Sequence, residues 1–148
     1  MTNHTITHTA GVNLLAQAMD RRQAAIDKAI ADAGVFWAFG QSQLDAEMAK
    51  RGLTQADLDD YVGILGGGAC HKDKVAGLYT DINMAGVNFT REINDLGLRK
   101  AYILYELNNH EAFYTYSIDD TLQALGGDYT SEEVMDVYRT KLLTAYNN

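Results

Sequence analysis

The chain has 148 residues, and its 20 acidic against 12 basic side chains give a formal net charge of −8 at pH 7. Hydrophobic residues make up 47% of the chain, which is enough for one domain with a buried core and argues against a disordered protein. We find neither a membrane-spanning stretch nor a signal-peptide pattern, and the acidic balance argues against binding duplex nucleic acid through its phosphates.

Cysteine usage narrows the chemistry further. Cys70 is the only cysteine, which excludes an intramolecular disulfide, a zinc site with two or more thiolates of one chain, and a Cys-x-x-Cys redox pair. We therefore expect a soluble protein of the cytoplasm, with no cofactor and no membrane contact.

The chain begins with nine polar, threonine-rich residues that lack an apolar period. We expect a flexible arm over residues 1–9 and a single domain over residues 10–148. Apolar residues at spacings of three and four then predict a long amphipathic helix from Val12 that ends at Gly34. The aromatic group that follows, residues 36–39, fits a strand or a buried turn.

The middle of the chain reads as short helices separated by glycines. One helix follows Ser42 and stops at Gly52, and Thr54 with Asp57 predicts a capping box for the next. An apolar run then meets a triple glycine. After it the pattern predicts a helix broken near Gly86 and a second, short helix over residues 89–96.

Residues 101–117 form the most aromatic part of the chain, with Asn108-Asn109 between two flanks rich in Tyr, Phe, Ile and Leu. Because both flanks have the length of strands and Asn tolerates positive φ, we predict a β-hairpin here. A helix over residues 98–112 is the alternative. The hairpin is preferred because the rings would crowd a helix but can pair across two strands.

Two helices complete the pattern. Asp119 opens a short helix that Gly126-Gly127 closes, and Thr130 with Glu133 predicts a capping box for the last helix. The predicted fold class is α+β: one compact domain with several helices around a small antiparallel β element that contains a central hairpin.

The triple glycine Gly66, Gly67 and Gly68 lies before a helix, where backbone N–H groups could face an anion. Neither phosphate-loop nor dinucleotide spacing fits, so a tight turn with close chain approach is the favoured interpretation. Cys70-His71 resembles a nucleophile and its base. Sequence neighbours seldom hydrogen-bond to each other, however, so Cys70 is expected to be a small buried hydrophobe.

The densest polar group is Asn108, Asn109, His110 and Glu111. At a hairpin tip it could act as an acid–base pair, but a zinc-protease motif is absent, and we assign neither catalytic nor metal-binding residues. We predict that the binding residues are those of this tip, those of the glycine turn, and the acidic pair Asp119 and Asp120. The carboxylates also stabilise helix N-termini, and the excess charge can attract a basic partner.

Three segments together resemble a group of small acidic proteins from phages, plasmids and other mobile elements. The resemblance spans residues 35–126 and rests on an aromatic-Ala-Phe segment with a following Gln, a glycine-rich turn, and an Asn-His-Glu segment. The matching residues are Phe36, Ala38, Phe39, Gln43, Gly66, Gly67, Gly68, Tyr105, Glu106, Asn109, His110 and Glu111. The group has no established enzymatic activity, so the resemblance implies a mobile-element origin more than a reaction.

We therefore expect a non-enzymatic accessory protein that binds a host protein in the cytoplasm of a bacterium, through an acidic surface and the exposed tip. Its most specific form is a counter-defence inhibitor whose carboxylates mimic nucleic-acid phosphates. Two alternatives stay open. One is a small hydrolase or phosphoryl-transfer enzyme that uses His110 with Glu111. The other is a structural or self-assembling component, a homodimer through the first helix.

Overall fold

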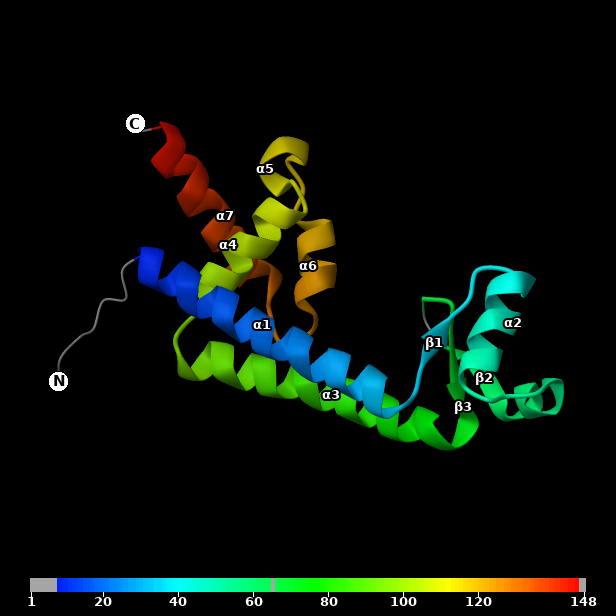
Figure 1. The fold of residues 1–148 in the computed structure, drawn as a ribbon. Helices are drawn as coiled ribbons and strands as arrows, with labels where there is room; N and C mark the ends of the chain where they lie inside the picture. Colours follow the sequence, from blue (N-terminus) through cyan, green and yellow to red (C-terminus); the bar gives the residue numbers. More distant parts are fainter. Residues whose placement is uncertain (1–7, 65, 147–148) are drawn as a thin grey trace. The chain divides into compact units, whose positions relative to one another are not determined.

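The computed structural model describes residues 8–64 and 66–146, and Figure 1 traces them. The contacts divide the chain into two units, each described by itself below. One unit comprises residues 19–89, and the other comprises residues 90–148 with the beginning of the chain up to residue 18. Two long helices, α1 (His8–Asp32) and α3 (Lys72–Asp95), contribute residues to both. In the described part of the chain, no helix is long and apolar enough to cross a membrane.

The unit of residues 19–89 contains the sheet. Its strands have the order β1-β3-β2, and both pairings are antiparallel. Between the halves of α1 and α3 that it contains, its elements are β1 (Phe36–Trp37), α2 (Gln41–Lys50), the 3-10 helix η1 (Gln55–Asp60), β2 (Tyr61–Ile64) and β3 (Gly68–His71). The α+β fold class is thus confirmed.

The glycine run makes the hairpin between β2 and β3. Ile64 pairs with Gly68, and Gly66 and Gly67 have φ values of 84° and 81°, which side chains other than hydrogen rarely allow. A Cβ atom on Gly68 would lie only 3.0 Å from Cγ1 of Val35 and 3.1 Å from Nε1 of Trp37. The tight turn with close chain approach is therefore confirmed.

The two faces of this sheet have different partners. One face shares a core with α1 and α3 that contains Cys70, which is fully buried. The other face carries Phe36 and Tyr61, whose ring centres lie 5.7 Å apart, with the Arg51 guanidinium over the Phe36 ring. The core residues of the first face are Ala29, Ala33, Val35, Cys70 and Leu78.

The second unit is helical. From the end of α3 it continues through α4 (Arg99–Asn109), α5 (Ala112–Thr115), α6 (Asp119–Leu125) and α7 (Ser131–Tyr146). Helix α4 packs against the other three. The helices predicted at Asp119 and after Thr130 are confirmed, and the Thr130 hydroxyl accepts the Glu133 N–H at 3.1 Å.

The predicted hairpin over residues 101–117 is wrong, because this segment is helical. Tyr102, Ile103, Glu106 and Leu107 are buried, which is the spacing of one helix face. A strand would expose one of the neighbours Tyr102 and Ile103. The predicted break near Gly86 is also wrong, since α3 continues through it at a cost of about 1 kcal/mol for one helical glycine.

The N-terminal prediction lies mostly outside the described residues. Of the arm predicted over residues 1–9, positions 1–7 are outside them, and α1 begins at His8. The long amphipathic helix is confirmed to end before Gly34, which has a φ of 66°. The capping box of Thr54 and Asp57 is also present and starts η1.

Candidate functional site: a tyrosine-bearing tip

The chain turns between the end of α4 and the start of α6, and we call this segment, residues 108–120, the tip. Helix α4 ends at Asn109, and α5 is a single turn between two residues in the left-handed conformation, Glu111 (φ 54°) and Tyr116 (φ 59°). The Glu111 carbonyl accepts the N–H groups of Tyr114 and Thr115, both at 2.9 Å. Left-handed backbone at two non-glycine residues is strained, and such strain is concentrated at functional sites.

Buried side chains anchor the tip to the rest of its unit. Ala112 is fully buried and Ile118 is buried. The Phe113 ring stacks on Tyr138 of α7 with ring centres 5.1 Å apart and planes 10° from parallel. Ring stacking beyond simple burial contributes about 0.5–1.5 kcal/mol. The outer side chains therefore stand on a fixed base.

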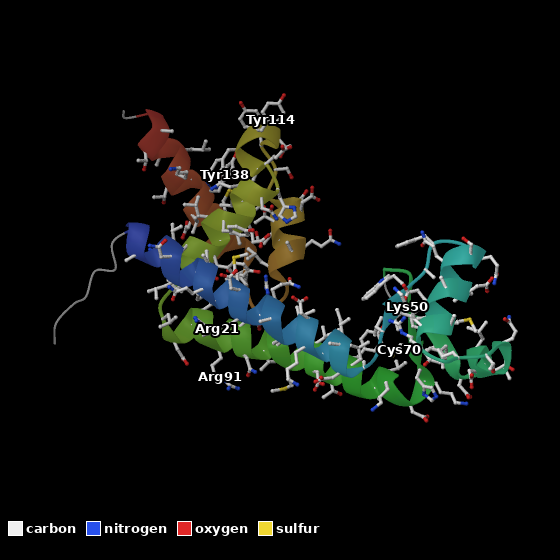
Figure 2. All side chains as sticks on the ribbon, viewed as in Figure 1. Arg21, Lys50, Cys70, Arg91, Tyr114 and Tyr138 are labelled. Carbon is white, nitrogen blue, oxygen red and sulfur yellow. The ribbon has the colours of Figure 1, made fainter. Side chains whose placement is uncertain are left out.

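The tip carries two exposed tyrosines, Tyr114 and Tyr116. Tyr114 is 84% exposed and Tyr116 is 80% exposed, and Figure 2 shows Tyr114 at the outer end of α5. Large side chains this exposed leave apolar area in contact with water. Tyrosine is enriched in protein–protein interfaces because one end of it is apolar and the other can hydrogen-bond. The tip therefore has the composition of a contact surface.

The charge around the tip is one-sided. Residues 101–138 contain eight carboxylates and neither Lys nor Arg, whereas the rest of the chain contains twelve of each sign. The whole formal charge of −8 therefore belongs to this one stretch. Grouping the carboxylates by helix N-terminus hides this asymmetry, whereas the absence of Lys and Arg over residues 101–138 reveals it.

One of these carboxylates is compensated by an ion pair. Arg99 donates from Nε and Nη2 to the two Glu133 carboxylate oxygens, at 2.8 and 2.9 Å, and from Nη2 to the Asp128 carbonyl at 2.7 Å. This pairing holds the pKa of Glu133 below its usual value. Burial raises the pKa of the neighbouring Tyr129 to about 12.

The carboxylates of the tip, unlike Glu133, form no ion pair with Lys or Arg in the described part of the chain. Glu111, Asp119 and Asp120 are exposed, and within the described residues no cation pairs with them. Asp119 and Asp120 lie in the first turn of α6, where the helix dipole favours them. The tip thus presents uncompensated negative charge beside its tyrosines.

His110 has a different partner from the predicted one. Its Nε2 lies 3.2 Å from Oε2 of Glu106, one turn back on α4, and the Glu106 side chain is buried. The Glu106 carbonyl also accepts the hydroxyl of buried Thr121 of α6, at 3.4 Å. His110 and Glu106 therefore tie α4 to the start of the tip. Across the described residues, His, Cys, Asp and Glu form no group of three able to hold a metal ion.

The other predicted site residues belong to the unit of residues 19–89. The N–H of Gly67 donates to the Ile64 carbonyl at 3.2 Å, closing the turn. Burial raises the pKa of the Cys70 thiol, which fits its interpretation as a small buried hydrophobe. His71 Nδ1 accepts the N–H of Asp73 at 3.2 Å, so it caps the start of α3.

Comparison with known protein families finds a match over most of the chain. Residues 15–147 match DUF7659, a family of unknown function. No curated protein and no solved structure matches the chain.

Proposed function

The chain belongs to DUF7659, a family of unknown function, and we propose that it is a non-enzymatic protein that works by binding another protein through the tip. The observation that carries this proposal is the pair of exposed tyrosines, Tyr114 and Tyr116, on a strained but anchored turn. A preorganised surface of this kind loses little conformational entropy on binding.

The charge distribution indicates the chemistry of the partner. Because the stretch around the tip carries the entire net charge, the partner presents a basic surface. The tyrosines supply the apolar contact, and Glu111, Asp119 and Asp120 orient the encounter from the rim. Charge of this kind mainly raises the association rate and selects against acidic partners.

In its most specific form, the proposal is that a phage or another mobile element encodes the protein. It then acts in the cytoplasm of the bacterial host on a host protein with a basic groove for nucleic acid. The carboxylates of the tip occupy that groove in place of phosphates. A counter-defence inhibitor works in this way.

Capture of the partner from a bacterial lysate tests the proposal, with the wild-type chain and a double tip variant, Tyr114→Ser with Tyr116→Ser, as baits. We expect the wild type to retain a nucleic-acid-binding protein that the tip variant loses. Raising the salt from about 0.05 to 0.5 M should release that protein, because the Debye length falls well below 10 Å. The nucleic acid that the captured protein normally binds should compete with the bait and release the captured protein.

The matched control is Tyr79→Ser, which removes a half-exposed tyrosine from α3 instead. This variant should capture as much partner as the wild type. Equal capture by the tip variant would contradict the proposal. The proposal would also be contradicted if added nucleic acid failed to release the captured protein from the bait.

A further inference from the structure

A hollow lies along α4 and α7 in the same unit as the tip. Its volume is about 570 Å3, which is in the range of sites that enclose a ligand or a protruding side chain. We call it the α4–α7 groove, and we call its apolar lining residues, Ala101, Leu104 and Val137, its floor. The remaining lining residues are Lys100, Glu133, Asp136, Thr140, Lys141 and Thr144.

The hydroxyls on the α7 side of the groove are already satisfied. Thr140 donates to the Asp136 carbonyl and Thr144 donates to the Thr140 carbonyl, both at 2.8 Å within their own helix. Such internal bonds leave the methyl groups to line the groove. The floor therefore suits an apolar or aromatic side chain better than a hydrogen-bonding ligand.

Two lysines, Lys100 and Lys141, are among the residues that line the groove. Lys100 and Lys141 are exposed, and neither forms an ion pair within residues 8–64 and 66–146. The Glu133 carboxylate is held by Arg99, which leaves Asp136 as the opposing charge. The two lysines thus attract an anionic occupant.

The tip is complementary to this groove both in apolar surface and in charge. It offers two exposed aromatic side chains for an apolar floor and three unpaired carboxylates for two unpaired lysines. We propose that the groove of one copy receives the tip of a second copy of the chain. Tyr114 and Tyr116 lie over the floor, with Glu111, Asp119 and Asp120 beside the lysines.

The tip of the same copy cannot fill the groove. Lys100 is at the beginning of α4 and Asn109 at its end, a distance of roughly 14 Å at 1.5 Å per residue. The stacking of Phe113 on Tyr138 fixes α5 in its own copy, where Tyr114 and Tyr116 are exposed and neither lines the groove. A second molecule is therefore required.

The resulting contact joins two different surfaces, so it is heterologous. Each added copy leaves one free tip and one free groove, and the assembly grows into a ring or a filament. This assembly goes beyond the proposed partner binding and is tested with the purified chain alone. Its failure therefore leaves partner capture unaffected, and the failure of capture leaves assembly unaffected.

Sedimentation velocity of the purified chain at low salt tests the proposal. We expect the mean mass of the wild type to rise with concentration, over a range that includes about 1 mM because single small contacts are weak. A groove variant, Lys100→Glu with Lys141→Glu, should remain at the mass of one chain. The tip variant, Tyr114→Ser with Tyr116→Ser, should do the same.

Mixing the two variants is the decisive step. The groove variant still has an intact tip, and the tip variant still has an intact groove, so an equimolar mixture should give a species of two chains that grows no further. A two-fold symmetric dimer through any other surface would not behave this way. All the substituted side chains are exposed, and circular dichroism verifies that each variant is folded.

Matched controls isolate the groove and the tip. Arg139→Glu makes the charge change of one of the two lysine substitutions, on α7 at a residue outside the groove lining, and Tyr79→Ser removes a tyrosine outside the tip. Both should assemble like the wild type. The proposal is overturned if the wild type stays at one chain throughout, if either double variant still assembles, or if their mixture does not pair.

Discussion

Two segments of this chain have turn-forming residues between apolar flanks but fold differently. Residues 61–64 and 68–71 pair as the β2–β3 hairpin, whereas residues 101–117 lie in α4, α5 and the tip. The first segment has glycines at its centre with φ above 80°, which lets the chain reverse in three residues. The second has Asn108 and Asn109 there, and both remain helical.

The spacing of buried residues separates the two segments more sharply than their composition. In β3, Gly68 and Cys70 are buried and alternate with less buried neighbours, as a strand requires. In α4 the adjacent residues Tyr102 and Ile103 are both buried, and Glu106 and Leu107 repeat them one turn later. Periodicity and turn chemistry therefore decide the element, and aromatic content does not, since Tyr114 and Tyr116 of the second segment are exposed.

The largest expected effect comes from comparing two side chains of the second segment. Ile103→Ala should lower the free energy of unfolding by about 2–5 kcal/mol, because the side chain is fully buried and its removal leaves a cavity. Tyr105→Ala should cost less than about 1 kcal/mol, because Tyr105 is 40% exposed. Urea unfolding monitored by circular dichroism measures both.

This pair distinguishes the helix from the hairpin directly. Residues two apart lie on the same face of a strand but about 200° apart on a helix. Equal losses for Ile103→Ala and Tyr105→Ala would contradict the helical assignment.

The next effect belongs to the glycine hairpin. Gly68→Ala should cost about 1–3 kcal/mol, because the added Cβ lies 3.0–3.1 Å from Val35, Ile64 and Trp37 and the core must shift. Gly86→Ala in α3 should instead raise the free energy of unfolding by about 0.5–1 kcal/mol, because open space surrounds its Cβ. Thermal unfolding of both variants tests the opposite signs, and destabilisation by Gly86→Ala would contradict a continuous α3.

Much of the fold is predictable from local patterns. Helix α1, the short strand at Phe36, α2 and the capping signals of Thr54 and Thr130 follow from spacing and capping chemistry. Gly86 misled the prediction because glycine lowers helix propensity by only about 1 kcal/mol, which tertiary packing readily exceeds. The tyrosines misled it because a helix can expose rings on one side, as it does at Tyr105.

The binding role of the predicted residues stays a prediction, and their local structure did not follow from the sequence. Residues 108–111 and 119–120 belong to the tip, whereas the glycine turn that was predicted with them belongs to the unit of residues 19–89. The exposure of Tyr114 and Tyr116 depends on two left-handed residues, and no sequence rule places Glu111 or Tyr116 in that conformation. The Glu106–His110 pair was missed because the hairpin prediction placed those two residues outside one helical turn.

The smallest expected changes in the free energy of unfolding come from two residues with positive φ, one a glycine and the other a tyrosine. Gly67→Ala should cost about 1 kcal/mol, since nothing lies within 4 Å of its Cβ and only backbone strain is added. Tyr116→Gly should raise the free energy of unfolding by up to about 1 kcal/mol. Relief of left-handed strain there exceeds the entropy that glycine loses on folding.

The same Tyr116→Gly variant should weaken both partner capture and self-assembly, because it removes an exposed ring from the tip. A gain in stability together with a loss of binding would mean that the strain is retained for the contact rather than for the fold. Denaturant unfolding and sedimentation of this one variant measure the two quantities. A loss of stability would instead show that the Tyr116 side chain supports the turn, and the tip would then be a structural corner.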